Sequence, residues 1–237
     1  MKKLTFFCGV LFLPFLTHAQ TNGQNEKTSL TRLDSVVVQA FRAGEKTPVA
    51  HSELTLKEMK RASPVQSLPM MLSLMPSVVS STEGGNGLGY SSLRVRGSDG
   101  SRINVTLNGI ALNDAESQEV FWVNIPSLTS ILQDVQLQRG VGTSTNGPAA
   151  FGASINMRTL YSSPSPYGIA EFGVASYNTY LSTIGAGSGI LRNGLSFDVL
   201  FSHNSGDGYI RNAMTDLNSL YASAAWLKKS STLRFTY

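Results

Sequence analysis

The chain has 237 residues and a formal net charge of +4, and 14% of its residues are charged. Its basic residues are scattered rather than arranged in a stripe, which argues against a nucleic-acid-binding protein. The single cysteine, Cys8, lies in the first segment, so disulfides and thiol ligands are not expected in the rest of the chain.

The first segment is typical of a secretory signal peptide. Lys2 and Lys3 form a basic start, residues 4–16 are apolar, and Thr17-His18-Ala19 offers a cleavage site. An apolar run of about thirteen residues is too short to span a bilayer as a helix. We therefore expect residues 1–19 to be removed and the mature chain to begin at Gln20. No later apolar run is long enough for a transmembrane helix, so membrane insertion would require a closed β-barrel.

Residues 20–40 are predicted to be a polar tether that ends in an extended segment. Residues 20–31 are polar, whereas Val36, Val37 and Val38 are consecutive β-branched residues that favour a strand. An ordinary first strand of a domain would have the same pattern. The polar residues on both sides of residues 33–40 make that position unusual for such a strand.

Residues 41–160 mix short helical and extended patterns and predict a small α+β domain. Helices are expected over 55–61, where Thr55 and Glu58 have capping-box spacing, and over 66–75, where Pro76 ends the pattern. A Gly-rich and Asn-rich loop follows at 82–90. Strands are expected over 92–96, 103–107, 135–139 and 153–159, with a tight turn at Asn108-Gly109.

Residues 161–237 are predicted to form about five antiparallel strands of a β-barrel. On one of them, Ser196, Asp198, Ser202 and Asn204 share a face with Leu200, and Leu195, Phe197, Val199 and Phe201 share the other. Short turns are expected at 192–194 and 228–231, and a long loop at 205–218. A soluble β-sandwich with one long loop is the alternative. About five strands cannot close a barrel, so the barrel is expected to be incomplete in this chain.

Several segments, in chain order, resemble the TonB-dependent outer-membrane receptors. Residues 33–40 resemble the TonB box, with Gln39 where threonine is usual. Residues 93–97, 105–114, 135–140 and 147–159 resemble successive motifs of the plug domain, with Ala111 in place of a frequent proline and Ala153 in place of a common glycine. The resemblance covers almost the whole chain.

The resemblance implies a domain order of signal peptide (1–19), tether with TonB box (20–40), plug (41–160) and first barrel strands (161–237). It implies a cell-outer-membrane transporter for active uptake of a scarce solute, of which an iron-siderophore, a cobalamin-like cofactor or another metal complex is the most plausible. A secreted or surface-attached β-rich binding protein is the alternative. Only residues 20–32 precede the box, so an N-terminal signalling domain is not expected. Neither an enzymatic activity nor a cofactor is expected.

The resemblance also implies three groups of site residues. The box would bind TonB by β-augmentation, through Asp34, Ser35, Val36, Val37 and Val38. Arg96 and Arg139 would pair with acidic residues of the barrel. The solute would be contacted by apex loops, with Asn86, Tyr90, Asp114, Glu116, Phe121 and Trp122 as candidates, although core anchoring is an equal alternative for the last two. Expected partners are TonB, outer-membrane lipid and a small molecule, and no nucleic acid.

Three other patterns indicate neither a metal site nor a catalytic site. Asp114, Glu116 and Glu119 share a loop, where carboxylates are usually solvated, and His51 and His203 lack ligand spacing. Residues 185–189 are rich in glycine, but they lack the spacing of a nucleotide loop and no helix is expected after them.

Overall fold

The computed structural model describes residues 42–44, 47–62, 66–141, 150–159, 163–228 and 231–237. The predicted signal peptide, tether and TonB box lie outside these ranges. Within the described residues, no helix is both long enough and apolar enough to cross a membrane.

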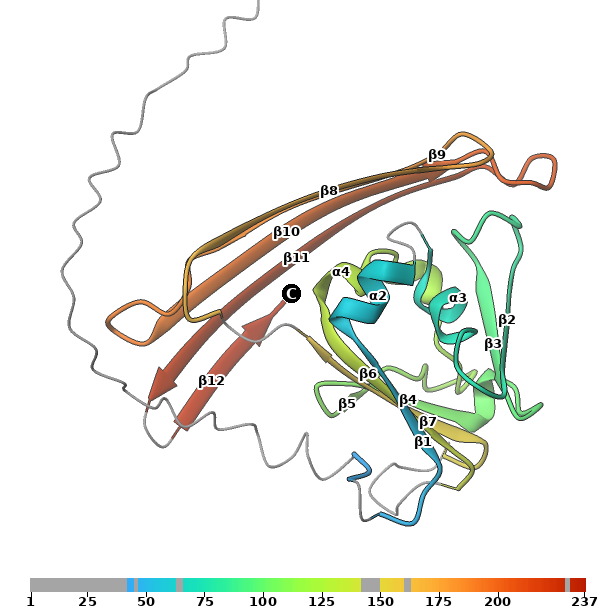
Figure 1. Ribbon diagram of the computed structural model, residues 1–237, viewed down its shortest axis with the longest axis horizontal. Coiled ribbons are helices and arrows are strands. Elements are labelled where there is room, and N and C mark those ends of the chain that lie inside the picture. The colour runs from blue at the N-terminus through green and yellow to red at the C-terminus, as the bar shows by residue number, and fades with distance from the viewer. Residues whose placement is uncertain (1–41, 45–46, 63–65, 142–149, 160–162, 229–230) are drawn as a thin grey trace, which may run out of the picture. The chain divides into compact units, whose positions relative to one another are not determined.

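The first part of the fold is a sheet with helices on one face (Figure 1). It has five strands in the order β1-β6-β7-β4-β5, with β4 and β7 parallel and the other neighbours antiparallel. The strands are β1 (His51–Thr55), β4 (Ile103–Leu107), β5 (Ile110–Ala111), β6 (Leu132–Arg139) and β7 (Ala153–Thr159).

The helices and a separate hairpin complete this α+β domain. The helices are α2 (Leu56–Ala62), α3 (Leu68–Leu72) and α4 (Leu128–Ile131), with 3-10 turns η1 (Gly100–Arg102) and η2 (Trp122–Asn124). The hairpin consists of β2 (Val78–Thr82) and β3 (Ser91–Val95), and residues 83–90 connect its strands. The strand β2 was not expected from the sequence, whereas the loop that follows it was.

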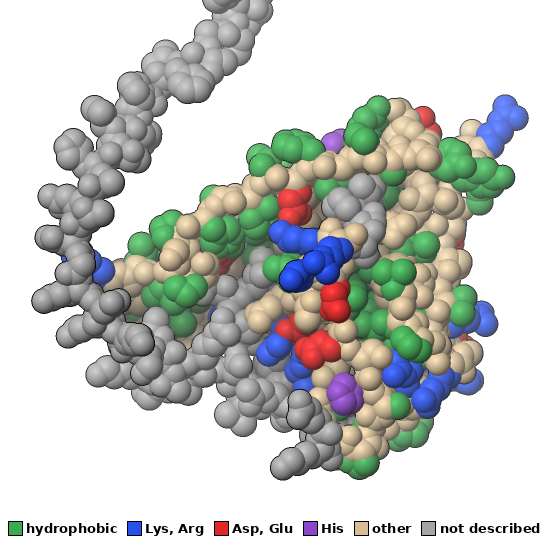
Figure 2. Space-filling view, viewed as in Figure 1, with side chains coloured by type: hydrophobic (Ala, Val, Ile, Leu, Met, Phe, Trp, Pro, Cys, Tyr) green, Lys and Arg blue, Asp and Glu red, His purple; other side chains and the backbone are tan. Residues whose placement is uncertain are grey.

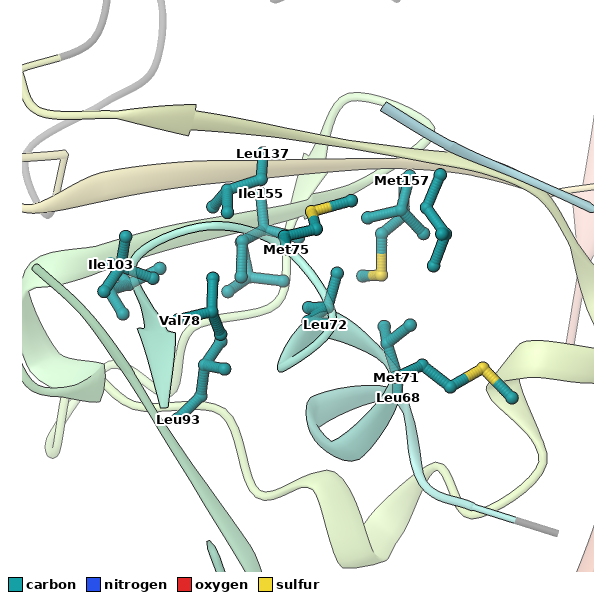
Figure 3. Packing of buried hydrophobic residues seen from close by; sticks show 14 of the residues in the cluster. Leu68, Met71, Leu72, Met75, Val78, Leu93, Ile103, Leu137, Ile155 and Met157 are labelled. Atoms are coloured by element: carbon teal, nitrogen blue, oxygen red, sulfur yellow. The ribbon is translucent and has the colours of Figure 1, made fainter. Parts of the chain in front are cut away.

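One face of the sheet packs against the helices and the hairpin to form the core (Figure 3). The strands contribute side chains such as Leu137, Ile155 and Met157, none of which is more than 1% exposed. Helix α3 contributes Met71 and Leu72, which are equally buried. Close packing of these apolar side chains is the main source of stability, because it removes their surface from water.

The two helices predicted early in the domain are present, but α3 is shorter than expected. Glu58 accepts hydrogen bonds from the N–H of Thr55 (2.8 Å) and from its hydroxyl (2.7 Å), so the capping pair predicted at the start of α2 is formed. These bonds hold the pKa of the Glu58 carboxyl below its usual value. Helix α3 ends at Leu72 rather than near Met75, and the hydroxyl of Ser73 bonds the carbonyl of Met70 at the turn that follows.

The Asn108-Gly109 turn was predicted correctly and joins β4 to β5. Both residues have positive φ, +53° and +83°, as a two-residue hairpin turn requires. The side chain of Asn108 also fastens the turn to β7: its Nδ2 donates to the Thr159 hydroxyl at 2.9 Å, and its Oδ1 accepts from the Thr159 N–H at 3.0 Å.

Replacing Gly109 with valine should destabilise the domain by about 1–2 kcal/mol, because a residue with a Cβ is strained in the left-handed region. Thermal unfolding of the protein, followed by hydrogen exchange in β4 and β5, measures the effect. Ile110→Val is the control, since Ile110 is 71% exposed and its backbone is extended. Equal midpoints for the two variants would contradict the prediction.

Downstream of this domain, five strands form an antiparallel meander with the order β12-β11-β10-β9-β8 (Figure 1). They are β8 (Tyr167–Ala175), β9 (Thr179–Gly187), β10 (Leu195–Gly206), β11 (Thr215–Lys228) and β12 (Ser231–Thr236). We call this sheet the wall. Its strand number agrees with the prediction, and it does not close into a barrel.

The two faces of the wall are inverted relative to a soluble protein. On β10, Ser196, Asp198 and Ser202 are buried, whereas Phe197 and Phe201 are 45% and 44% exposed. Figure 2 shows apolar side chains along the outer edge of the wall. In a β-sandwich the apolar face would pack against a second sheet. The exposed apolar face therefore favours the barrel expectation over the sandwich.

The long connection after β10 is shorter than predicted. The pairing of β10 with β11 continues to Gly206 and Thr215, so the loop comprises residues 207–214 rather than 205–218. Ser205 and Asn218 belong to the ends of β10 and β11. Because polar residues lie on both faces at these strand ends, the alternation of polar and apolar residues does not mark where the strands end and the loop begins.

Candidate functional site

The residues predicted to bind TonB lie outside the described residues. These are Asp34, Ser35, Val36, Val37 and Val38. The described chain begins at Arg42, only two residues after the predicted box ends. The contacts of Arg42 and Ala43 therefore show how the chain directly after the predicted box is attached to the domain.

Arg42 and Ala43 are bound to the face of β6 that points away from the core. The Arg42 guanidinium contacts Asp134 Oδ1 at 2.6 Å and Glu53 Oε1 at 2.5 Å. The backbone of Ala43 is paired with the side chain of Gln136: the N–H donates to Oε1 at 2.8 Å, and the carbonyl accepts from Nε2 at 3.0 Å. Asp134, Gln136 and Ala43 are all buried. We call this set of contacts the clasp.

Asp134 has a second arginine partner on the neighbouring strand. Arg158 of β7 donates from Nε to both carboxylate oxygens, at 3.0 and 2.9 Å, and also from a terminal nitrogen. Two guanidinium groups thus compensate one carboxylate that is only 4% exposed. This network was not expected from the sequence. The sequence does contain one signal for it. Asp134 on β6 and Arg158 on β7 are charged residues on strands whose alternate residues are apolar.

The structure places the two arginines predicted to contact the barrel at one end of the plug sheet. Arg139 is bound within the plug, with a guanidinium nitrogen 2.7 Å from the Ser52 hydroxyl and another 3.4 Å from the His51 carbonyl. Arg96 is exposed, has φ +51°, and bonds Ser77 through its backbone N–H. Neither has an ion pair among the residues described, so their pairing with barrel carboxylates stays a prediction.

The loop 83–90, which carries Asn86 and Tyr90, is attached to one end of the wall. The N–H of Tyr209 donates to the carbonyl of Gly84 at 2.7 Å, and Asn86 Nδ2 is 3.5 Å from the Thr179 hydroxyl. Tyr209 also contacts Tyr177 edge to face, with ring centroids 5.4 Å apart. Asn86 is thus partly occupied in holding the plug to the wall, whereas Tyr90 is 57% exposed.

In the loop 113–122 the candidate residues have different surroundings. Asp114 accepts from the Ser117 N–H (2.8 Å), the Ser117 hydroxyl (3.0 Å) and the Glu116 N–H (3.1 Å), and these bonds lower its pKa. Asp114 therefore organises the loop, while Glu116 is exposed. Phe121 is 47% exposed, but Trp122 is 7% exposed and belongs to the core cluster. Trp122 therefore lies in the core, as the core-anchoring alternative expects.

The described residues contain no group of three or more His, Cys, Asp or Glu side chains that could hold a metal ion. His51 contacts the carbonyl of Val49, and His203 contacts Asn218 Oδ1, each at 3.0 Å. The first contact is local in sequence, and the second joins paired residues of β10 and β11.

The plug contacts the polar face of the wall through side chains. Asn204 of β10 donates to the Ser127 hydroxyl at 3.3 Å, and Lys60 of α2 forms an ion pair with Glu171 of β8 at 2.8 Å. Within the wall, the Tyr167 hydroxyl donates to Asp198 at 2.8 Å. These contacts show that the α+β plug lies against the polar face of the antiparallel wall.

One comparison with known proteins concerns the α+β domain. Residues 43–154 match the model of the TonB-dependent receptor plug domain. Among the described residues, this plug domain is followed by the antiparallel sheet of strands β8–β12. No curated protein sequence is significantly similar to the chain.

Solved structures of siderophore receptors share this fold. The siderophore receptor PirA from Acinetobacter baumannii is 13% identical with a TM-score of 0.62, over 78% of this chain and 30% of PirA. The pyoverdine outer membrane receptor FpvA from Pseudomonas aeruginosa is 14% identical with a TM-score of 0.64, over 80% of this chain and 27% of FpvA. The ferric yersiniabactin uptake receptor FyuA from Yersinia pestis is 19% identical with a TM-score of 0.54, over 75% and 28%. The chain thus spans about three tenths of the length of these receptors.

Proposed function

We propose that this chain is the front part of an outer-membrane importer that takes up a scarce solute when TonB pulls on residues 34–38. The observation that carries the proposal is the combination of a plug domain with a wall whose polar face meets the plug and whose apolar face is exposed. Such a wall suits lipid outside and an aqueous lumen inside. The plug would then block the lumen until it is remodelled.

The proposed cargo is a ferric siderophore. The support is the fold that the chain shares with three receptors whose names specify a siderophore or its ferric complex. Cobalamin-like cofactors and other metal complexes are the alternatives that uptake assays must separate. The proposed contact residues are Tyr90, Phe121 and Glu116, which are exposed on two loops of the plug.

Uptake by cells that express the full-length receptor tests this function. Radioactive iron, presented as a panel of ferric siderophores, should accumulate in cells with TonB and not in cells without it. Radioactive cobalamin is the parallel probe. Iron uptake that is equal with and without TonB, or uptake of no probe at all, would contradict the proposal.

The proposed lipid contact makes a separate prediction about the wall. Val199, near the middle of β10, lies on the exposed apolar face. Val199→Arg should place a charge in the hydrocarbon layer at a cost of about 2–4 kcal/mol, and should reduce the amount of receptor assembled in the outer membrane.

Ser205→Arg is the matched control, because residue 205 lies on the same face but next to the last residue of the strand, where the cost falls to about 0–1 kcal/mol. Heat-modifiable migration of outer-membrane fractions measures folded receptor. Equal assembly of both variants would argue against lipid at this face.

A further inference from the structure

The predicted TonB box is attached to the plug by a very short piece of chain. From Val38, the last residue proposed to pair with TonB, to Arg42 there are four residue steps, which extend to about 14 Å at most. Arg42 and Ala43 are held by Asp134 and Gln136 of β6. While the clasp is closed, TonB could pair with the box only very close to the plug.

The described residues between the clasp and β1 form local hydrogen bonds. Gly44 bonds the Thr47 side chain at 2.9 Å, Thr47 bonds the Gly44 carbonyl at 2.9 Å, and Val49 bonds the Thr47 carbonyl at 2.8 Å. The next contact with the sheet is the Ala50 carbonyl, which accepts from the Arg139 N–H at 2.9 Å, followed by the β1–β6 ladder. Opening the clasp would extend the distance from Val38 to its anchor to about 40 Å.

The clasp can open without leaving a buried charge unpaired. Asp134 is only 4% exposed, so losing all its partners would be very unfavourable. When Arg42 leaves, however, Arg158 still donates from Nε to both carboxylate oxygens. Arg42 and Glu53 also separate when the clasp opens, but the Glu53 side chain is 44% exposed, so water can solvate its charge. The arrangement therefore separates the stability of β6 and β7 from the attachment of Arg42.

We infer that the clasp controls the reach of the TonB box, and that it is the first contact to open under load. A pull applied before Arg42 acts on Arg42 and Ala43 first, and on the five-residue ladder of β1 with β6 only after residues 43–50 have extended. Under the pull of TonB, the chain before β1 would thus lengthen first, and the plug sheet would be disturbed only afterwards. This inference rests on the proposed role of residues 34–38.

The test measures the reach of the box in the detergent-solubilised full-length receptor. Gln39→Cys introduces a thiol beside the clasp, and its reaction with a bulky polyethylene-glycol maleimide reports how far residue 39 can move from the plug. Adding Arg42→Gln should accelerate this reaction by roughly tenfold, which corresponds to losing about 1.4 kcal/mol from the closed state. Arg42→Lys should give an intermediate rate, because it keeps the charge and loses the fork geometry.

Lys57→Gln is the matched control, since it removes the same charge from an exposed position on α2 and should leave the rate unchanged. Equal rates with and without Arg42→Gln would overturn the inference. A faster reaction accompanied by loss of hydrogen-exchange protection in β6 would also overturn it, because the plug itself would then have loosened. The maleimide assay contains no TonB, so its result does not depend on whether residues 34–38 bind TonB. A wrong assignment of the box would instead change the result of the uptake assay.

Single-molecule pulling from the N-terminus gives an independent readout. The wild-type receptor should show a first extension of up to about 29 Å, the length of eight residue steps from Arg42 to Ala50, before the sheet yields. The Arg42→Gln variant should lack this separate event. A first event of the same size and force in both proteins would overturn the inference.

Discussion

Replacing Val37 with proline is expected to abolish TonB-dependent uptake while leaving the receptor folded in the outer membrane. In β-augmentation, the backbone of the added peptide supplies most of the hydrogen bonds. Proline removes one donor and restricts the backbone of the preceding residue. Folding should be unaffected, because residue 37 precedes the plug domain at 43–154. Uptake of radioactive iron from the ferric-siderophore panel measures the loss.

Two further variants serve as a test of the strand register and as a control. An added strand presents its N–H groups alternately to either side, so Val36→Pro tests the other register. Ser29→Pro places the same residue in the predicted tether and should leave uptake unchanged. Wild-type, TonB-dependent uptake in both Val36→Pro and Val37→Pro would show that residues 34–38 are not the TonB box.

Asp134→Ala should produce the largest loss of stability in the plug, about 3–5 kcal/mol. The substitution removes the carboxylate that compensates both Arg42 and Arg158, whose side chains are only 10% and 19% exposed. Hydrogen exchange in β6 and β7 of the detergent-solubilised receptor, measured against denaturant, reports the change.

Glu53→Gln is the control for the Asp134 variant. Its carboxylate also binds Arg42, but the side chain is 44% exposed, so water screens the pair and the loss should stay within about 1 kcal/mol. If Asp134→Ala were no more destabilising than Glu53→Gln, the buried network would not be what holds β6 and β7 together.

The parts of the fold that were predicted correctly depend on local patterns. Period-two alternation identified strands of the wall such as β10, because its residues alternate between a largely polar and an apolar side. Asn108-Gly109 marked its hairpin because few other pairs tolerate two positive φ values. The spacing of Thr55 and Glu58 marked the start of α2 for a similarly local reason.

The parts that were missed depend on contacts distant in sequence. Arg42 and Asp134 are separated by 92 positions, and no local pattern indicates that they meet. The sequence left solute stacking and core anchoring as equal alternatives for Trp122, and only its packing against distant residues shows that it lies in the core. Helix α3 is shorter than its apolar spacing suggested, since Met75 reaches the same core from the turn after the helix.

The position of β7 has a consequence for biosynthesis. It is the last strand of the plug sheet to be synthesised, yet it occupies the middle of the sheet, between β6 and β4. Until residues 153–159 are available, the β1–β6 pair and the β4–β5 hairpin have no common neighbour, and apolar side chains such as Val135 and Val105 lack the strand that covers them. A nascent chain that stalls before residue 153 would expose these surfaces to aggregation, so we expect periplasmic chaperones to bind this receptor before its plug can form.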